Sequence, residues 1–395
     1  MLRLLPVVII WFLLDLYAFQ GITTLTSSEL IYSAYWLVDG ILISTILFLL
    51  LSGQLNRNST IVNPLMGLTI LSIVPKLVML PILFLEDIIR IIRSAFTGSM
   101  PLRIEGISEL ALVLAAITAI GIVYGLIKGK HAYRVHRVKL PFKDLPKAFE
   151  GFTITQLSDI HSGSFSDAAA VLKGVELANK QKSDIIVFTG DLVNNTADEM
   201  NPWISVFSKL KAPFGKFSIL GNHDYGDYVA WESTHAKAQN LQNLKNVHPE
   251  IGFRLLLNEN VKIEKNGQSI SLIGVENWGK RGFTKYGDLN KALMGTNDSD
   301  FKILLSHDPS HWEAETLQHS TPIHLTLAGH THGMQFGLEI FGFKWSPIKY
   351  IYRQWAGAYE KAGKYIYVNR GFGFLGFPGR VGILPEITVI ELVKR

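Results

Sequence analysis

Four long apolar stretches occupy the first 127 residues of this 395-residue chain, and they constrain its fold more than any other feature. Each has close to the roughly 20 residues that an α-helix needs to cross a bilayer. The first stretch could instead be a signal peptide, but its apolar core is long and no small-residue cleavage site follows it. The sequence therefore predicts an all-α region of four transmembrane helices, over residues 4–22, 30–51, 64–85 and 107–127.

The composition changes after residue 127. A basic juxtamembrane segment at 128–148, which also contains the first predicted strand, leads into a normally charged region at 149–395. Short loops rich in Lys and Arg usually stay in the cytoplasm. An N-terminus inside the cell leaves Arg90, Arg93 and Arg103 outside and places seven basic residues inside: Arg3, Arg57, Lys128, Lys130, Arg134, Arg137 and Lys139. We therefore expect a multi-pass integral membrane protein whose globular region faces the cytoplasm.

Two features of the apolar region leave alternatives open. Asp39 and Lys76 fall near mid-membrane depth when the second and third spans run antiparallel, whereas Asp15 lies off-centre. The first two could form a structural ion pair or belong to a transport or ligand site. The segment 85–96 interleaves isoleucines with arginines, which favours a helix at the headgroup level over a continuation of the third span.

Composition also limits the chemistry that the chain can carry. There is no cysteine, so disulfides and thiolate metal ligands are excluded. The net charge of +5 is modest, and much of it follows the last apolar stretch instead of forming a stripe among aromatic residues. Nucleic acid is therefore not indicated as a partner. Any metal must be held by His, Asp, Asn or water.

Five short apolar runs in the region 149–395 each stop at a polar residue. They read FTITQLSDIH, DIIVFTGD, KFSILGNHD, KILLSHD and IHLTLAGHTH. Such runs predict buried strands, and the segments 165–181 and 200–211 between them predict helices, so the fold class is α/β. We expect a sandwich of two sheets, in which three later strands complete the second sheet, at 270–275, 365–369 and 387–392.

Candidate metal ligands stand where these runs end: Asp159, His161, Asp191, Asn222, His307, His330 and His332. Because side chains alternate along a strand, D-x-H at 159–161 and H-x-H at 330–332 should each set two ligands on one side of an extended segment. The glycines of TGD, LGN and AGH should let the backbone turn sharply. Two divalent ions about 3.5–4 Å apart need a bridging ligand, for which Asp191 is the candidate, and a bridging hydroxide would be the nucleophile.

Together these motifs resemble the calcineurin-like metallophosphoesterase superfamily over roughly residues 150–395: D-I-H at 159–161, G-D at 190–191, G-N-H-D at 221–224, His307, and G-H-T-H at 329–332. The resemblance implies a four-layer αββα sandwich. It implies one ion held by Asp159, His161, Asp191 and His332, and a second held by Asp191, Asn222, His307 and His330. It also implies that His223 lies beside the phosphate, as a proton donor to the leaving oxygen or a stabiliser of charge, and that Asp224 orients His223.

The C-terminal part resembles a narrower bacterial group of membrane-associated phosphoesterases. The matching residues are Gln335, the N-R-G-F-G loop at 369–373 and the P-E-I segment at 385–387. Met334 stands where that group usually has a second glycine, so the loop after His332 should be less free to approach the metals. Arg370 could contact a phosphate or form a structural ion pair.

The sequence thus predicts a membrane-anchored phosphohydrolase with two divalent metal ions, which could be Mn, Fe, Zn, Co or Ni. Membrane lipids are expected partners, and anchoring favours an amphipathic phosphate-ester substrate such as a lipid-linked phosphodiester or pyrophosphate. Candidate pocket residues are Tyr225, Trp231, Trp278 and Trp345. A non-enzymatic membrane scaffold or sensor with a metal-binding domain, and a small transporter with a regulatory domain, are the alternatives. The complete ligand set favours the enzyme.

Overall fold

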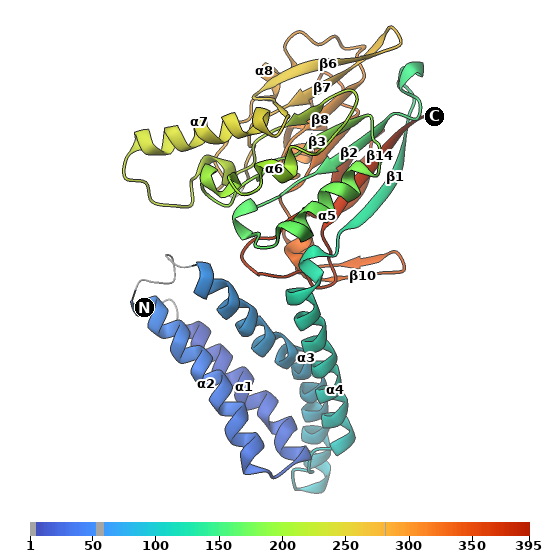
Figure 1. The fold of residues 1–395 in the computed structure, drawn as a ribbon. Coiled ribbons are helices and arrows are strands. Elements are labelled where there is room, and N and C mark those ends of the chain that lie inside the picture. The colour runs from blue at the N-terminus through green and yellow to red at the C-terminus, as the bar shows by residue number, and fades with distance from the viewer. Residues whose placement is uncertain (1–4, 53–58, 281) are drawn as a thin grey trace. The chain divides into compact units, whose positions relative to one another are not determined.

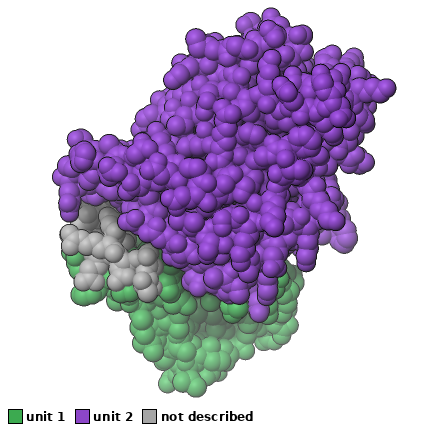
Figure 2. Space-filling view, turned by 45° about the horizontal axis from the view of Figure 1, so that its top comes forward, with its two compact units in different colours: residues 1–127, 376–379 green, residues 128–375, 380–395 purple. Residues whose placement is uncertain are grey.

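The computed structural model describes residues 5–52, 59–280 and 282–395, which fall into two compact units (Figure 1). Unit 1 comprises the described residues up to 127 together with residues 376–379, and unit 2 comprises the described residues of 128–375 and 380–395 (Figure 2). Arg3, Arg57 and the start of the first predicted span lie outside the described residues. The orientation inferred from the loop charges therefore stays a prediction.

Unit 1 contains four long helices: α1 Leu5–Leu25, α2 Glu29–Leu51, α3 Ser59–Thr97 and α4 Glu105–Ile127. All four are long and apolar enough to cross a membrane, which confirms the predicted four-helix transmembrane region.

Helix α3 differs from its prediction, because one continuous helix of 39 residues joins the third span to the segment 85–96. The separate helix expected at the headgroup level is therefore wrong. Pro75 and Pro81 lie within α3 without ending it. At about 1.5 Å per residue, α3 is longer than the ~30 Å apolar core of a bilayer, so its polar turns can extend beyond that core without a break in the helix.

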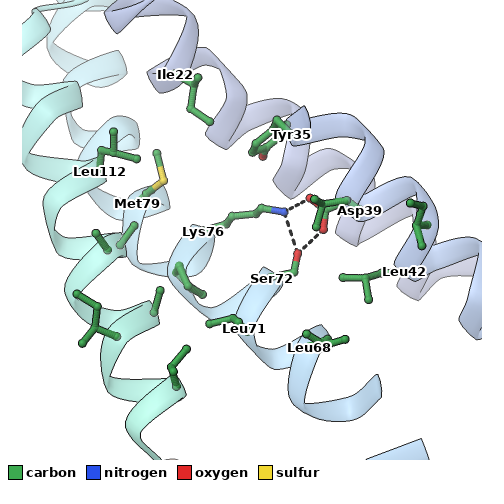
Figure 3. Close-up of a pocket in the computed structure, with 18 residues that line it drawn as sticks. Ile22, Tyr35, Asp39, Leu42, Leu68, Leu71, Ser72, Lys76, Met79 and Leu112 are labelled. Atoms are coloured by element: carbon green, nitrogen blue, oxygen red, sulfur yellow. Dashed lines mark hydrogen bonds and ion pairs between the residues drawn. The ribbon is translucent and has the colours of Figure 1, made fainter. Parts of the chain in front are cut away.

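Among the charged side chains buried in unit 1, Asp15, Asp39 and Lys76 form one cluster. The Nζ atom of Lys76 lies 2.7 Å from Asp15 Oδ1. It also contacts the carboxylate of Asp39, to which the Ser72 hydroxyl donates (Figure 3). The predicted contact between Asp39 and Lys76 is thus confirmed, and Asp15 joins it. A largely apolar cavity of about 830 Å³ opens beside Asp39, Ser72 and Lys76. The shared ammonium supports the structural interpretation of these charges.

Unit 2 is built on two six-stranded sheets. The first sheet has the order β1-β14-β2-β3-β4-β5, with bounds Arg134–Phe142, Glu386–Lys394, Thr153–Leu157, Ile185–Phe188, Lys216–Ser218 and Arg254–Leu255. The second has the order β12-β13-β9-β8-β7-β6, with bounds Gly357–Lys361, Lys364–Val368, Leu325–Ala328, Lys302–Leu305, Gln268–Gly274 and Glu259–Lys265. Strands β2 to β5 are parallel, as are β13, β9, β8 and β7, so the carboxyl ends of each set meet at one edge.

The two sheets pack face to face through alternate apolar side chains, such as Ile154 and Val187 of the first and Leu272 and Leu325 of the second. The outer face of the first sheet is covered by α5 Ala168–Asn179, α6 Ile204–Phe207 and α7 Thr234–Glu250. The second is covered by α8 Leu289–Leu293. These layers confirm the α/β class and the predicted αββα sandwich.

Two details of the predicted sandwich are corrected. The strand expected at 387–392 is β14, which lies in the first sheet, between β1 and β2, and not in the second. It pairs parallel to β1 and antiparallel to β2, so the chain returns to the sheet in which it began. The helix expected at 200–211 is only the short α6.

Candidate metal centre

The predicted ligands lie just beyond the carboxyl ends of parallel strands. Asp159 follows β2, Asp191 follows β3, Asn222 follows β4, His307 follows β8, and His330 follows β9. Ligands from both sheets therefore meet at a common edge of the sandwich, where open α/β sheets commonly place their sites.

Five of the seven predicted ligands have a left-handed backbone, with φ between +48° and +70°: Asp159, His161, Asp191, His330 and His332. Residues other than glycine rarely adopt this conformation, which costs about 1–3 kcal/mol each and clusters at functional sites. The extended geometry predicted for D-x-H and H-x-H is therefore wrong. Strands β2 and β9 end before these motifs, and a sharp turn brings the paired side chains together.

Close approach of the backbone explains the glycines that precede the ligands. Gly190 has φ +96°, and a Cβ there would lie 2.6 Å from the Gly221 nitrogen. A Cβ at Gly329 would lie 2.3 Å from Asp159 Oδ2. A side chain at either position would displace the loops that carry the ligands.

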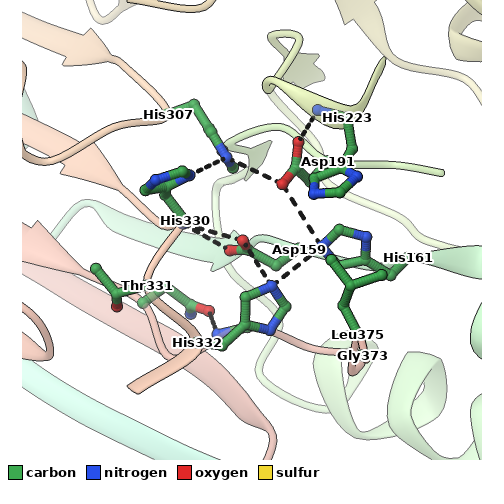
Figure 4. Close-up of polar contacts among 12 residues, drawn as sticks. Asp159, His161, Asp191, His223, His307, His330, Thr331, His332, Gly373 and Leu375 are labelled. Atoms are coloured by element: carbon green, nitrogen blue, oxygen red, sulfur yellow. Dashed lines mark hydrogen bonds and ion pairs between the residues drawn. The ribbon is translucent and has the colours of Figure 1, made fainter. Parts of the chain in front are cut away.

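The first ligand cluster joins Asp159, His161 and His332, whose candidate ligand atoms all lie within 4.8 Å of one another (Figure 4). The Nε2 atoms of His161 and His332 are 3.0 Å apart, and His332 Nε2 is 3.2 Å from Asp159 Oδ1. All three side chains are buried. Two imidazole nitrogens and a carboxylate that converge in this way form a donor set suited to a divalent metal ion.

The second cluster joins Asp191, His307 and His330. His307 Nε2 lies 3.1 Å from Asp191 Oδ2 and 3.2 Å from His330 Nδ1. Asn222 also lines this region, and its Oδ1 is buried without a hydrogen bond to any described residue. An orphaned amide oxygen beside two imidazoles and a carboxylate fits a second metal ion.

Burial and neighbouring charges shift the pKa values of these groups. Burial alone would raise the pKa of Asp191, but His307 and His223 lower it well below its ordinary value. Burial lowers the pKa of His161 far below its ordinary value. The carboxylate is therefore ionised and the His161 ring neutral, which are the protonation states that metal coordination requires.

Hydrogen bonds beyond the ligands orient the rings. His307 Nδ1 donates to the Thr189 carbonyl at 2.7 Å, which directs Nε2 toward Asp191. His330 Nε2 lies 2.9 Å from the Tyr352 hydroxyl. Arg380 is completely buried, donates to the Gly373 carbonyl and lies 3.4 Å from His332 Nδ1. Sequence reasoning missed Thr189, Tyr352 and Arg380 because none belongs to a ligand motif.

The hydrogen bonds of Asp224 differ from the orienting role that the resemblance implied for it. His223 donates its backbone N–H to Asp191 Oδ1 at 2.9 Å, and its ring Nδ1 donates to the Asn194 carbonyl at 2.8 Å. The buried Asp224 carboxylate accepts backbone N–H groups of Asp191, Leu192 and Gly221. Burial and Asp191 raise the pKa of Asp224 to about 7. Asp224 therefore fixes the loop that carries Asp191, while Asn194 orients the His223 ring.

A cavity of about 400 Å³ opens onto both clusters. Its polar side includes Asp191, Asn222, His223, His330 and His332, and its apolar side consists of Tyr228, Phe283, Ile348, Ile351, Tyr352 and Leu375. None of the four predicted pocket aromatics belongs to the described lining of this cavity. Tyr225 stacks on Tyr286, and Trp278 stacks on His311. Trp231 donates to the Gly226 carbonyl, and Trp345 belongs to a separate hairpin.

The structure also bears on two positions in the C-terminal motifs, Arg370 and Met334. Arg370 Nη1 and Nη2 each lie 2.7 Å from a carboxylate oxygen, of Glu386 and Glu339 respectively, which favours the structural ion pair. Met334 has φ +57° after Gly333 at +53°. Its conformation is one that glycine adopts without strain, which explains the glycine usual at this position.

Comparisons with known proteins agree with this geometry. A family model described as calcineurin-like phosphoesterase matches residues 152–334, and one described as probable calcineurin-like phosphoesterase, transmembrane domain, matches residues 2–130. The uncharacterized metallophosphoesterase YkuE of Bacillus subtilis is 32% identical over 71% of this chain and 93% of its own length. A transmembrane protein with metallophosphoesterase domain from Danio rerio is 31% identical over 72% of this chain and 62% of its own length.

The fold is that of a metallophosphoesterase domain with two candidate metal-binding clusters, and this chain joins it to four membrane helices. With such relatives, the chain belongs to the calcineurin-like phosphoesterase family. Among solved structures, the phosphopantetheinyl hydrolase PptH of Mycobacterium tuberculosis matches 51% of this chain and 89% of its own at 12% identity and a TM-score of 0.31. So distant a match carries no argument about the substrate.

Proposed function

We propose that this protein is a dinuclear metal-dependent phosphoesterase whose substrate is a lipid-linked phosphodiester or pyrophosphate. The observation that carries the dinuclear centre is the position of Asp191. Its Oδ2 atom lies 3.1 Å from His307 Nε2 and 3.5 Å from His161 Nε2. One carboxylate oxygen thus reaches a histidine of each cluster, as a bridging ligand must.

The two clusters divide the remaining ligands. Asp159, His161 and His332 would hold one ion, and Asn222, His307 and His330 would hold the other. Divalent ions bound there would neutralise the phosphoryl oxygens and activate a water molecule as the nucleophile. Mn, Fe, Zn, Co and Ni all accept this mixture of oxygen and nitrogen ligands.

In this proposal, His223 transfers a proton to the leaving group. Its Nδ1 is engaged with the Asn194 carbonyl, and the ring lines the cavity, so Nε2 is the nitrogen available to a substrate. We assign to Nε2 the donation of a proton to the leaving oxygen. Asp224 acts indirectly in this assignment, because its carboxylate holds the backbone of Asp191 and Gly221.

The lining of the cavity supports a lipid-linked substrate. Six of its side chains are apolar or aromatic, and they face the same space as the ligands. Burying apolar surface contributes about 25 cal/mol per Å², so an acyl or polyprenyl chain would gain affinity there that a small soluble phosphate would not. The four membrane spans keep the domain at a bilayer, where such substrates are found. The domain would face the cytoplasm by the loop-charge prediction.

Substitution of the bridging residue tests the dinuclear centre. Asp191→Asn in the full-length, detergent-purified protein should reduce both bound metal and Mn²⁺-dependent hydrolysis of bis-p-nitrophenyl phosphate. Loss of a single electrostatic contact to a transition state lowers kcat by about 10²–10³, and we expect at least that. Asp198→Asn, at an exposed residue seven positions further on, is the matched control and should change neither. Full metal content and activity in Asp191→Asn would refute the bridging role, and absence of metal and hydrolysis in the unaltered protein would favour the non-enzymatic scaffold.

The lipid-linked substrate is tested at the cavity wall. Leu375→Ser removes about 1.5 kcal/mol of apolar contact, so kcat/KM for a long-chain phosphodiester in mixed micelles should fall about tenfold. Hydrolysis of bis-p-nitrophenyl phosphate should change little, and Leu375→Met should retain both activities. An equal loss on the two substrates would show that Leu375 supports the fold instead of a lipid chain.

A further inference from the structure

The hairpin formed by β10 Leu338–Ile340 and β11 Phe343–Trp345 presents its apolar face outward. Leu338 pairs with Trp345 and Ile340 with Phe343, so these side chains share one face of the hairpin. Leu338, Ile340 and Phe343 are 43%, 47% and 59% exposed. A hairpin on a water-facing protein normally buries such a face against the core.

The polar face of the same hairpin is turned toward the body of unit 2. Glu339 accepts a hydrogen bond from Arg370 Nη2 at 2.7 Å. Lys344 donates to the Ala356 carbonyl, and its Nζ lies 3.3 Å from the Tyr359 hydroxyl. These contacts fix the hairpin with its charged side chains inward and its apolar side chains outward. A hairpin in water is expected to place its polar side chains outward and its apolar side chains inward, so this hairpin has the opposite arrangement.

The tip of the hairpin carries a residue that the turn does not favour. Phe341 and Gly342 have φ +50° and +84°, the signature of a two-residue turn that usually prefers Asn-Gly. Phe341 is nonetheless completely exposed. The neighbouring hairpin of β12 and β13 makes the same kind of turn with Ala362 and Gly363, at φ +54° and +76°. The backbone therefore does not require an aromatic side chain at this place.

The hairpin belongs to a larger apolar surface. Of the ten large hydrophobic residues that are exposed in the described part of unit 2, seven lie within 18 consecutive positions: Met334, Leu338, Ile340, Phe341, Phe343, Tyr350 and Ile351. We call them the apolar surface 334–351. Ile351 also lines the cavity of the metal centre, so one end of this segment borders the site. The exposed basic residue Lys349 lies within this segment, and the exposed Arg353 follows it.

We propose that the apolar surface 334–351 inserts into the acyl-chain layer of the membrane that the four spans cross. A contiguous exposed apolar patch marks an interaction site, and aromatic tips flanked by Lys and Arg suit a bilayer with anionic headgroups. The spans continue directly into unit 2, so a bilayer is an obligatory neighbour of this domain. Membrane insertion itself does not depend on the proposed function. Its consequence, that a lipid-linked substrate enters from the acyl layer, rests on that function.

The absence of native cysteine permits a direct test. Phe341→Cys in the full-length protein is labelled with an environment-sensitive nitrobenzoxadiazole dye and reconstituted into phosphatidylethanolamine and phosphatidylglycerol vesicles. Ala362→Cys is the matched control, because it lies at the same position of an equivalent exposed turn. We expect a blue-shifted emission at position 341 that nitroxide-labelled acyl chains quench strongly, and little effect of those chains at position 362. Phe343→Cys provides a second position on the apolar face.

The possible outcomes separate this inference from the enzymatic proposal. Equal, weak quenching by the labelled lipids at positions 341, 343 and 362 would overturn the insertion. A dye at 341 that is shielded from aqueous iodide but not quenched by the lipids would also overturn it, because a protein contact would then cover the surface. Mn²⁺-dependent hydrolysis of bis-p-nitrophenyl phosphate, measured on the same labelled proteins, reports on the proposed function independently of either result.

Discussion

Each unit has a cluster that contains two buried carboxylates, but the two clusters neutralise them in different ways. In unit 1, Asp15 and Asp39 share the ammonium group of Lys76, a cation that the chain itself supplies. In unit 2, Asp159 and Asp191 are faced by histidine rings. The ring nitrogens of His161 and His332 lie only 3.0 Å apart. The lone pairs of two such nitrogens can both bind an exchangeable cation. The first arrangement completes its ion pairs as the helices pack, whereas the second is suited to bind something.

The backbone conformation also differs between the two clusters: it is regular helix in unit 1 and strained turns in unit 2. Asp15, Asp39 and Lys76 lie within α1, α2 and α3, so helix packing alone positions them. The clusters of unit 2 stand on turns in which Asp159 and Asp191 have φ +52° and +62°. Strain of this kind persists where a site requires it. The comparison teaches that buried charged residues on regular helices favour a structural role, whereas buried charged residues on strained turns favour a functional site.

Removal of the internal cation should break the unit 1 cluster. Lys76→Met leaves two buried carboxylates without their partner, which costs about 3–5 kcal/mol for a buried pair. We expect the free energy of unfolding of the helical unit, measured by steric trapping in detergent micelles, to fall by that amount. The metal content of unit 2 should be unchanged in the folded fraction.

Two further variants qualify the result for Lys76. Arg93→Met, at an exposed position of the same helix, removes a charge without exposing a buried partner and should be nearly neutral. Asp39→Asn in the Lys76→Met background should recover part of the lost stability, because one unpaired carboxylate is then neutral. Unchanged stability in Lys76→Met would show that the cluster does not hold the helices together.

Much of this difference could be predicted from the sequence. The apolar stretches specified four spans because a membrane helix must be long and uniformly apolar. The order of strands and ligand motifs specified an α/β sandwich with ligands at strand ends. The contact between Asp39 and Lys76 also followed from their depth in antiparallel spans.

What the sequence did not reveal depends on local geometry or on long-range pairing. Nothing in D-I-H shows that Asp159 is left-handed, because an aspartate at the end of a strand is compatible with an extended or a turn conformation. The position of β14 beside β1 depends on strand pairing across most of unit 2, which no local pattern encodes. Asp15 joined Lys76 because α1 packs against α3, a contact that depth along the chain alone did not specify.

A variant of His223 sharpens the comparison within unit 2, since the proposed role of this residue is proton transfer and not metal binding. His223→Gln should retain bound metal while kcat for an alkyl phosphodiester falls by about 10²-fold or more. The loss should be much smaller for a p-nitrophenyl ester, whose leaving group needs no proton. His319→Gln, at a residue outside the cavity lining, is the control. Loss of metal, or equal losses on both esters, would contradict the assignment of Nε2 as the proton donor.

A buried histidine outside both clusters gives the smallest expected effect. His248 of α7 is completely buried, with Nδ1 2.9 Å from Ser218 Oγ and no described partner at Nε2. Burial lowers its pKa from 6.5 to about 3. Below pH 6.5 the unfolded chain therefore takes up a proton that the folded chain refuses, and stability is lost as the pH falls from 6.5 toward 3. At pH 5 this amounts to about 2 kcal/mol.

Denaturant unfolding of unit 2 between pH 7.5 and pH 5 measures this term. His248→Asn keeps a polar atom near the position of Nδ1, so it should lower stability at pH 7.5 through lost packing but flatten the decline toward pH 5 by about 2 kcal/mol. His235→Asn, at an exposed position of the same helix, should leave the pH dependence as it is. An undiminished acid sensitivity in His248→Asn would place the titrating groups elsewhere.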